Sequence, residues 1–229
     1  MKRESIYKRI GAFLLAFLMI PVLIGCKNQS SAAKTAEPAL TVTPASQAES
    51  AVSSVPESEP GRQNGERFDE IIILEGMEET VHYEHVRSET VGIEMDYDYE
   101  SFARHSEAGL ERFISIWDNT ENPENYLDVM FSAEDAESVA ANVRESLSQM
   151  YDLLEGTREL DRAGSCLYIE ASVLKDTNTM ADQLQMVYII PASDGCRIAT
   201  MHVAAEAAEG FGRRFRYMLD TLAVIEQRA

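Results

Sequence analysis

The sequence predicts an α+β domain, in which a mostly antiparallel sheet of about seven or eight strands is covered by two main helices. Short β-branched or alternating segments follow one another along residues 70–131 and again along residues 166–204. Two other segments, 132–156 and 206–222, repeat their apolar side chains every three or four residues, as one face of a helix does. Runs of neighbouring strands with interspersed helices are typical of the α+β class.

The chain begins with a segment typical of an exported protein. Four basic residues among the first nine precede an uncharged apolar run, Ile10–Ile24. This run is shorter than the roughly 20 residues that a membrane-spanning helix needs, and Pro21 interrupts it. It ends in Leu23-Ile24-Gly25-Cys26, which resembles a bacterial lipobox. The resemblance implies cleavage before Cys26 and a diacylglyceryl thioether on its sulfur, since two acyl chains hold a protein stably to a membrane. The alternative is an ordinary cleaved signal in which Cys26 is incidental.

Three parts of the chain follow from this. Residues 1–25 are predicted as the lipoprotein signal peptide, and residues 26–65 as a disordered tether that starts at the lipidated Cys26. The tether is rich in Ser, Ala, Pro and Glu and has too few large apolar side chains to form a core. Its coil spans roughly 35 Å. Residues 66–229 form one domain, which we expect on the extracytoplasmic side of the cell membrane.

The domain is strongly acidic. The whole chain has 20 basic and 39 acidic residues, of which 7 and 5 precede residue 66, so the domain carries 13 and 34, a net charge of −21. Phosphate backbones and anionic headgroups repel such a surface. Nucleic acid is therefore excluded as a partner, and the only membrane contact expected is through the lipid on Cys26.

Four elements are predicted in the first half of the domain. They are a hairpin of strands 70–75 and 80–87, a strand over 91–100, one helical turn at 101–106, and a hairpin of strands 113–117 and 126–131. The alternation is cleanest in 91–100, where the apolar residues point to one face. The opposite face carries an acidic row, Glu94, Asp96, Asp98 and Glu100.

The acidic row has two interpretations. A solvated row on an edge strand discourages pairing with another sheet. Alternatively, carboxylates roughly 7 Å apart approach a hard cation. We expect the solvated edge strand, and the sequence does not decide whether the row binds a cation.

The second half of the domain begins with a predicted helix. Ser132 is its expected cap, with Asp135 as the capping partner, and Gly156 its expected end. Strands over 166–174, 184–190 and 196–204 follow, and a closing helix covers 206–222. Cys166 and Cys196 fall on the two outer strands of this meander. Because those strands are about 9–10 Å apart, we expect two buried thiols and no disulfide.

Two of these segments resemble a known group of proteins. The turn Leu74–Thr80 and the closing helix Glu206–Leu222 are similar to those of uncharacterised exported lipoproteins of Gram-positive anaerobes, and the strand order resembles the PsbP-like fold. These motifs are structural, so the resemblance implies a fold and an anchored location but no catalytic or ligand-binding residue.

The remaining polar and aromatic residues give no catalytic constellation. His82 and His85 are three apart on a strand and project to opposite faces, and neither they nor His105 and His202 indicate a metal site. Two clusters have structural interpretations favoured over binding ones. Arg213, Arg214 and Arg216 form a solvated helix face or an anion patch. The tyrosines and Trp117 pack in the core or line a groove; they are Tyr83, Tyr97, Tyr99, Tyr126, Tyr168 and Tyr188.

The sequence thus predicts a lipid-anchored module that binds or scaffolds an unknown protein or small-molecule partner, without cofactor, metal or catalysis. A small-molecule or cation receptor is the alternative, and a hydrolase is less favoured. No phosphate loop, nucleophile elbow or paired-cysteine metal motif is present.

Overall fold

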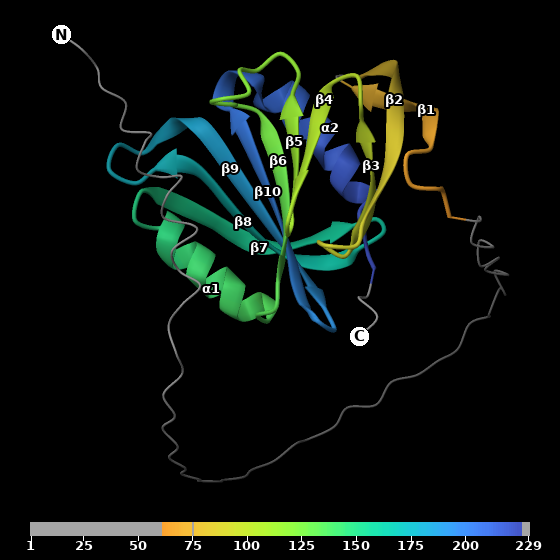
Figure 1. The fold of residues 1–229 in the computed structure, drawn as a ribbon. Helices are drawn as coiled ribbons and strands as arrows, with labels where there is room; N and C mark the ends of the chain where they lie inside the picture. Colours follow the sequence, from red (N-terminus) through yellow and green to blue (C-terminus); the bar gives the residue numbers. More distant parts are fainter. Residues whose placement is uncertain (1–60, 75, 226–229) are drawn as a thin grey trace, which may run out of the picture. The chain divides into compact units, whose positions relative to one another are not determined.

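Eleven strands and two α-helices form the residues that the computed structural model describes, which are 61–74 and 76–225 (Figure 1). The predicted signal peptide, Cys26 and the tether up to residue 60 lie outside these residues. Gly65, predicted as the last part of the tether, already donates its N–H to the His85 carbonyl at 2.8 Å.

The strands form two antiparallel sheets. The small sheet has the order β1 (Arg67–Leu74), β2 (Met77–Ser88), β3 (Ile93–Asp98), β11 (Ala223–Val224). The large sheet has the order β4 (Phe102–Glu107), β5 (Leu110–Ser115), β6 (Tyr126–Ser132), β10 (Gly195–Ala204), β9 (Thr179–Ala192), β8 (Gly164–Leu174), β7 (Tyr151–Leu160). The predicted α+β class, with one sheet of seven or eight strands, is therefore wrong: the domain is mostly β, with two sheets and two short helices.

The helices occupy different places on these sheets. Helix α1 (Ala136–Leu147) lies across one face of β7, β8 and β9, where Val139, Ala140 and Leu147 are buried (Figure 1). Helix α2 (Ala208–Asp220) follows a 3-10 turn, Ala205–Ala207, and contacts both β3 and β10. The larger core cluster joins side chains from both sheets to the buried face of α2, including Phe215 and Leu219.

One predicted helical turn and the last part of one predicted helix are strands instead. Residues 101–106 are mostly in β4, which pairs with β5. The helix predicted up to Gly156 ends at Leu147, and β7 begins at Tyr151, because its backbone pairs with β8. Leu154, an apolar residue within the predicted helical segment 132–156, is exposed on β7. The N-cap of α1 is Asp135 rather than Ser132, since its carboxylate accepts the Ser138 N–H at 2.9 Å.

The cysteine prediction is confirmed. Cys166 lies on β8 and Cys196 on β10, with β9 between them, and both are free and buried. They also belong to different core clusters, Cys166 to the larger one and Cys196 to the one beneath α1. The thiols therefore lie on opposite faces of the large sheet, a second obstacle to a disulfide.

Candidate binding surfaces

The acidic row of β3 is divided between interior and surface. Asp96 is only 3% exposed and lies opposite His85 in the β2–β3 register. Its Oδ1 is 2.6 Å from His85 Nδ1, and its Oδ2 is 3.4 Å from an Arg62 guanidinium nitrogen. The prediction of a solvated face on an edge strand is wrong at this residue, because Asp96 is buried and the Thr221 hydroxyl, at the end of α2, accepts its backbone N–H at 2.8 Å.

Asp98 is buried in the same way. It accepts a 2.8 Å hydrogen bond from Arg214 of α2, and its other oxygen accepts the N–H groups of Glu100 and Ser101. Arg214 also binds Glu79 of β2. The predicted solvated arginine face of α2 is thus wrong for Arg214, which fastens the helix to two strands.

The outer members of the row remain nearer to solvent. Glu94 binds Arg162 and Arg87, and Glu100 lies 3.8 Å from His82. Arginine side chains therefore supply positive charge beside Glu94, Asp96 and Asp98, where the cation interpretation placed a metal. No group of three or more potential metal ligands occurs in residues 61–74 and 76–225.

The histidines separate as predicted, with His82 and His85 on opposite faces of β2. His82 lies at the surface, where a hydrogen bond to Asp69 at 2.7 Å raises its pKa. His202 stacks on Tyr126, with ring centroids 4.3 Å apart. Burial, and then the nearby Arg112 charge, lower the pKa of His202 to about 4. His202 is therefore neutral at physiological pH.

Two further charged residues are buried without any sequence signal. Arg197 is fully buried on β10 and forms a bidentate pair with Asp194 at 2.8 and 2.9 Å. Gly92 adjoins it at a φ of +74°, and a Cβ there would lie 2.3 Å from an Arg197 nitrogen. Burial favours the neutral form of Glu111, but hydrogen bonds from Arg104, Ser88 and Ser106 outweigh it and lower the pKa of Glu111. Both groups serve the packing of the sheets.

The aromatic residues are also divided. Four of the tyrosines are in the larger core cluster, as the core interpretation predicted: Tyr83, Tyr97, Tyr168 and Tyr188. These four side chains come from both sheets, and their packing in the core leaves them 2–7% exposed. Trp117 differs, since it is 67% exposed in the loop after β5. It lies beside exposed Ile116, and its ring is 5.9 Å from that of Phe211 on α2.

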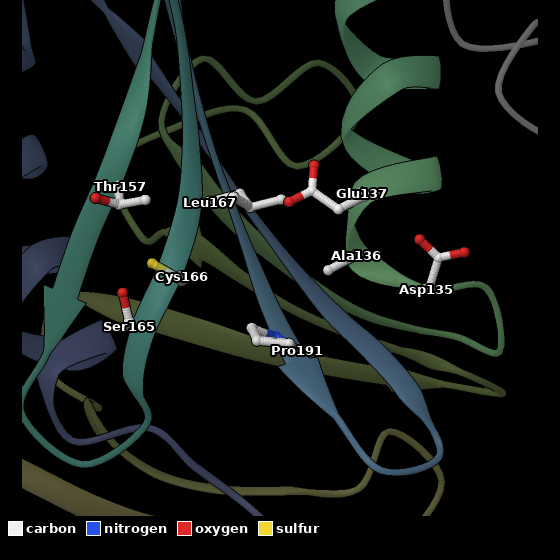
Figure 2. A pocket seen from close by; sticks show the side chains of 8 residues that line it. All are labelled: Asp135, Ala136, Glu137, Thr157, Ser165, Cys166, Leu167 and Pro191. Atoms are coloured by element: carbon white, nitrogen blue, oxygen red, sulfur yellow. The ribbon is translucent and has the colours of Figure 1, made fainter. Parts of the chain in front are cut away.

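One open depression of about 390 Å³ lies between the start of α1 and strands β7–β9 (Figure 2). It is lined by Asp135, Ala136, Glu137, Thr157, Ser165, Cys166, Leu167 and Pro191. Asp135 is already used as the helix cap, and the Cys166 thiol donates to the Arg158 carbonyl at 3.3 Å. Burial raises the pKa of Cys166, and no histidine lines the depression, so its hydroxyl and thiol groups have no adjacent base there.

Comparison with known proteins gives similarities of fold only. No family model and no curated protein matches the chain. Among solved structures, it is similar to cyanobacterial PsbP from Synechocystis sp. PCC 6803, at 12% identity and a TM-score of 0.44, over 62% of this chain and 92% of that one. It is also similar to the Ran-binding protein Mog1p of Saccharomyces cerevisiae, at 11% identity and a TM-score of 0.42, over 64% and 97%. A protein from Bacteroides thetaiotaomicron VPI-5482 matches at 11% and 0.37, over 59% and 46%.

A PsbP protein is thus among the similar structures. Similarities at this level of identity define neither a family nor a function. None of the helices in the described residues has the length and apolar character needed to cross a membrane.

Proposed function

We propose that the chain is a lipid-anchored extracytoplasmic module that binds a partner protein through Ile116, Trp117 and Phe211, which we call the aromatic patch. The anchor rests on the lipobox-like sequence at Cys26, and the binding role rests chiefly on the exposure of Trp117. Tryptophan is enriched among the residues that dominate protein–protein binding energy, and large apolar groups on a surface mark contact sites.

The aromatic patch is held by ordered structure. Asp118, next to Trp117, accepts the Glu124 N–H at 2.8 Å and the Asn125 N–H at 2.5 Å, which closes the loop between β5 and β6. The backbone N–H of Trp117 donates a hydrogen bond to Ser115 Oγ at 3.3 Å, and Phe211 lies on helix α2. A partner that covers this surface needs to order little of it, which favours affinity.

Binding rather than chemistry is supported by how the ionisable groups are used. The buried charges Asp96, Asp98 and Arg197 each have a partner of opposite charge inside the domain. These partners are, in the same order, Arg62, Arg214 and Asp194. Two features suggested a small-molecule or cation receptor, the tyrosines and the acidic row. Most of the tyrosines are packed in the core, and Glu94, Asp96 and Asp98 of the acidic row form ion pairs with arginines. The proposal therefore keeps a protein partner and no catalytic role.

The patch is tested by site-specific photocross-linking on intact cells. A photoreactive phenylalanine analogue replaces Trp117 in one variant and the exposed Met180 of β9 in a control variant. We expect one protein adduct at position 117 that is absent at position 180 and is competed by the purified domain but not by its Trp117→Ala form. Equal adducts at both positions, or no adduct at 117, would contradict the patch as the contact site.

The anchor is tested separately. Cys26→Ala is expected to leave the chain unprocessed or to release it from the membrane fraction, and mass spectrometry of the native protein should find a diacylated first residue at Cys26. A membrane-bound, correctly processed Cys26→Ala chain would contradict the lipid anchor without bearing on the aromatic patch.

A further inference from the structure

Strand β1 ends the small sheet and has an open edge. The His85 N–H binds the Glu66 carbonyl at 2.8 Å, and β1 and β2 then pair without a register shift from Arg67 to Leu74. Because hydrogen-bonded pairs alternate in an antiparallel ladder, residues 68, 70 and 72 bond to β2. The backbone N–H and C=O groups of residues 67, 69, 71 and 73 consequently face outward. The Ile73 carbonyl accepts a hydrogen bond from the Tyr217 hydroxyl at 3.0 Å, which leaves residues 67, 69 and 71 facing the open edge.

The side chains along this edge are apolar on one face. Ile71 is 65% exposed and Ile73 is 47% exposed, and they project to the same face because they are two residues apart. An eight-residue strand with unpaired backbone groups and exposed isoleucines is a template for another strand.

The other sheet edges in the described part of the chain are protected. Strand β11 has two residues, and the outer half of β4 carries exposed polar side chains, His105 to Glu107. Strand β7 has a register shift at Asp152/Leu153 and several exposed charged residues. Shortness, polar residues and bulges are the devices by which proteins prevent strand addition. Strand β1 is regular and keeps isoleucines instead.

The charge of this region indicates what the added strand carries. Residues 66–79 contain six acidic residues and one basic residue, Arg67. Arg67 is already paired with Glu84 at 2.8 Å. The exposed Glu70 projects to the face opposite Ile71. A strand that alternates apolar and basic side chains would place its apolar residues beside Ile71 and Ile73 and its basic residues beside Glu70.

We propose that the open edge of β1 binds an extended basic peptide segment of a partner as an additional strand of the small sheet. This interaction surface is separate from the aromatic patch and does not require the lipid anchor. A second copy of the chain fits less well, because two domains of charge −21 repel each other and bring the same acidic residues together.

The probe is a short capped peptide in which lysine and valine alternate, titrated against the purified domain by fluorescence anisotropy. We expect saturable binding that weakens at least about tenfold when alternate peptide nitrogens of the probe are methylated, or when glutamate replaces lysine. Amide exchange should slow at Arg67, Asp69 and Ile71 in the complex. Trp117→Ala should bind the probe as the unchanged domain does, so failure of the aromatic patch and failure of this edge are distinguishable.

Two variants test the edge itself. Ile71→Pro removes an N–H that faces outward, so the β1–β2 ladder is kept while strand addition is blocked, and at least about tenfold weaker binding is expected. Glu70→Lys reverses an exposed charge and should also weaken binding, which keeps the test valid if the proline variant does not fold. Equal binding of the probe and its methylated form, unchanged binding by both variants, or a dimer that forms through β1 and excludes the probe would overturn the proposal.

Discussion

Strands β1 and β3 belong to the same sheet, yet β3 buries a charged side chain and β1 exposes an apolar one. Asp96 of β3 is buried, whereas Ile71 of β1 is mostly exposed to solvent. The cause is what packs against each strand. Strand β3 contacts α2, from which Thr221 at the helix end and Arg214 bond to Asp96 and Asp98, whereas nothing among the described residues covers the face of β1 that carries Ile71. The difference teaches that packing by other elements decides which faces are covered, and alternation along one strand does not contain that information.

The comparison also has an energetic side. A buried charge is tolerated only when it is paired and hydrogen-bonded. Asp96 meets this condition through Arg62 and a hydrogen bond with His85, and Asp98 meets it through Arg214. The exposed isoleucines of β1 have no such compensation within the described residues. A structural role is thus sufficient to explain the carboxylates of β3, whereas the exposed isoleucines of β1 are explained by no contact within the described residues and motivate the proposed strand addition.

The largest expected effect comes from breaking the buried pair of β3. Asp96→Ala leaves the His85 ring buried without its carboxylate and removes the partner of Arg62 as well. Breaking a buried pair by removing one member is strongly destabilising, so we expect a loss of about 3 kcal/mol in the free energy of unfolding, measured with urea.

Glu100→Ala is the matched control, since it removes a carboxylate of the same row whose side chain is 62% exposed. Its expected effect is below about 0.5 kcal/mol. Equal losses in the two variants would show that burial does not distinguish members of the row.

A second effect contrasts two histidines, one in each sheet. His85 has a carboxylate partner, whereas burial and the Arg112 charge lower the pKa of His202 to about 4. Between about pH 4 and pH 6.5, the imidazole of His202 is therefore protonated in the unfolded chain and neutral in the folded domain. The free energy of unfolding is not reduced by His202 above pH 6.5. It falls by up to about 3 kcal/mol as the pH falls toward 4.

His202→Phe should remove that part of the acid dependence, because no imidazole remains to be protonated. The measurement is the free energy of unfolding of both proteins at intervals between pH 4 and 7. Parallel curves for the two proteins would mean that His202 titrates alike in the folded and unfolded chains.

Local patterns predicted much of the strand content but not the sheet architecture. The hairpins, the meander that contains both cysteines and the closing helix were predictable because alternation, turn residues and apolar periodicity are encoded within each segment. The division into two sheets was not, since it depends on which distant strands pair, such as β6 with β10.

The candidate surfaces show the same limit. The sequence marked Trp117 but favoured the core for it, and it gave no sign that β1 ends a sheet. The burial of Arg197 has no sequence signal, since a single arginine within an apolar strand usually lies at the surface. Its burial is made possible by Asp194 and by the space at Gly92, and the latter is 105 residues away in the sequence.

A smaller effect is expected at Gly156, in the segment that was predicted as the end of a helix and is part of strand β7. Gly156 was predicted to end a helix in a left-handed conformation, but it lies within β7 without a positive φ, and no atom lies within 4 Å of an added Cβ. Gly156→Ala should therefore stabilise the domain by about 0.5 kcal/mol, because alanine restricts the unfolded chain. A loss of stability in urea unfolding would instead fit the helix end that the sequence predicted.

The smallest expected effect concerns the two thiols. Cys166 and Cys196 are free, buried and on opposite faces of the large sheet, and burial raises the pKa of both. A reductant has no bond to break, so the melting temperature should not change on its addition. Thiol-specific reagents should modify the native domain only as fast as it opens, because the thiolate is the reactive form and both sulfurs are covered. A large fall in melting temperature under reduction would require a disulfide, and hence a different register for β8, β9 and β10.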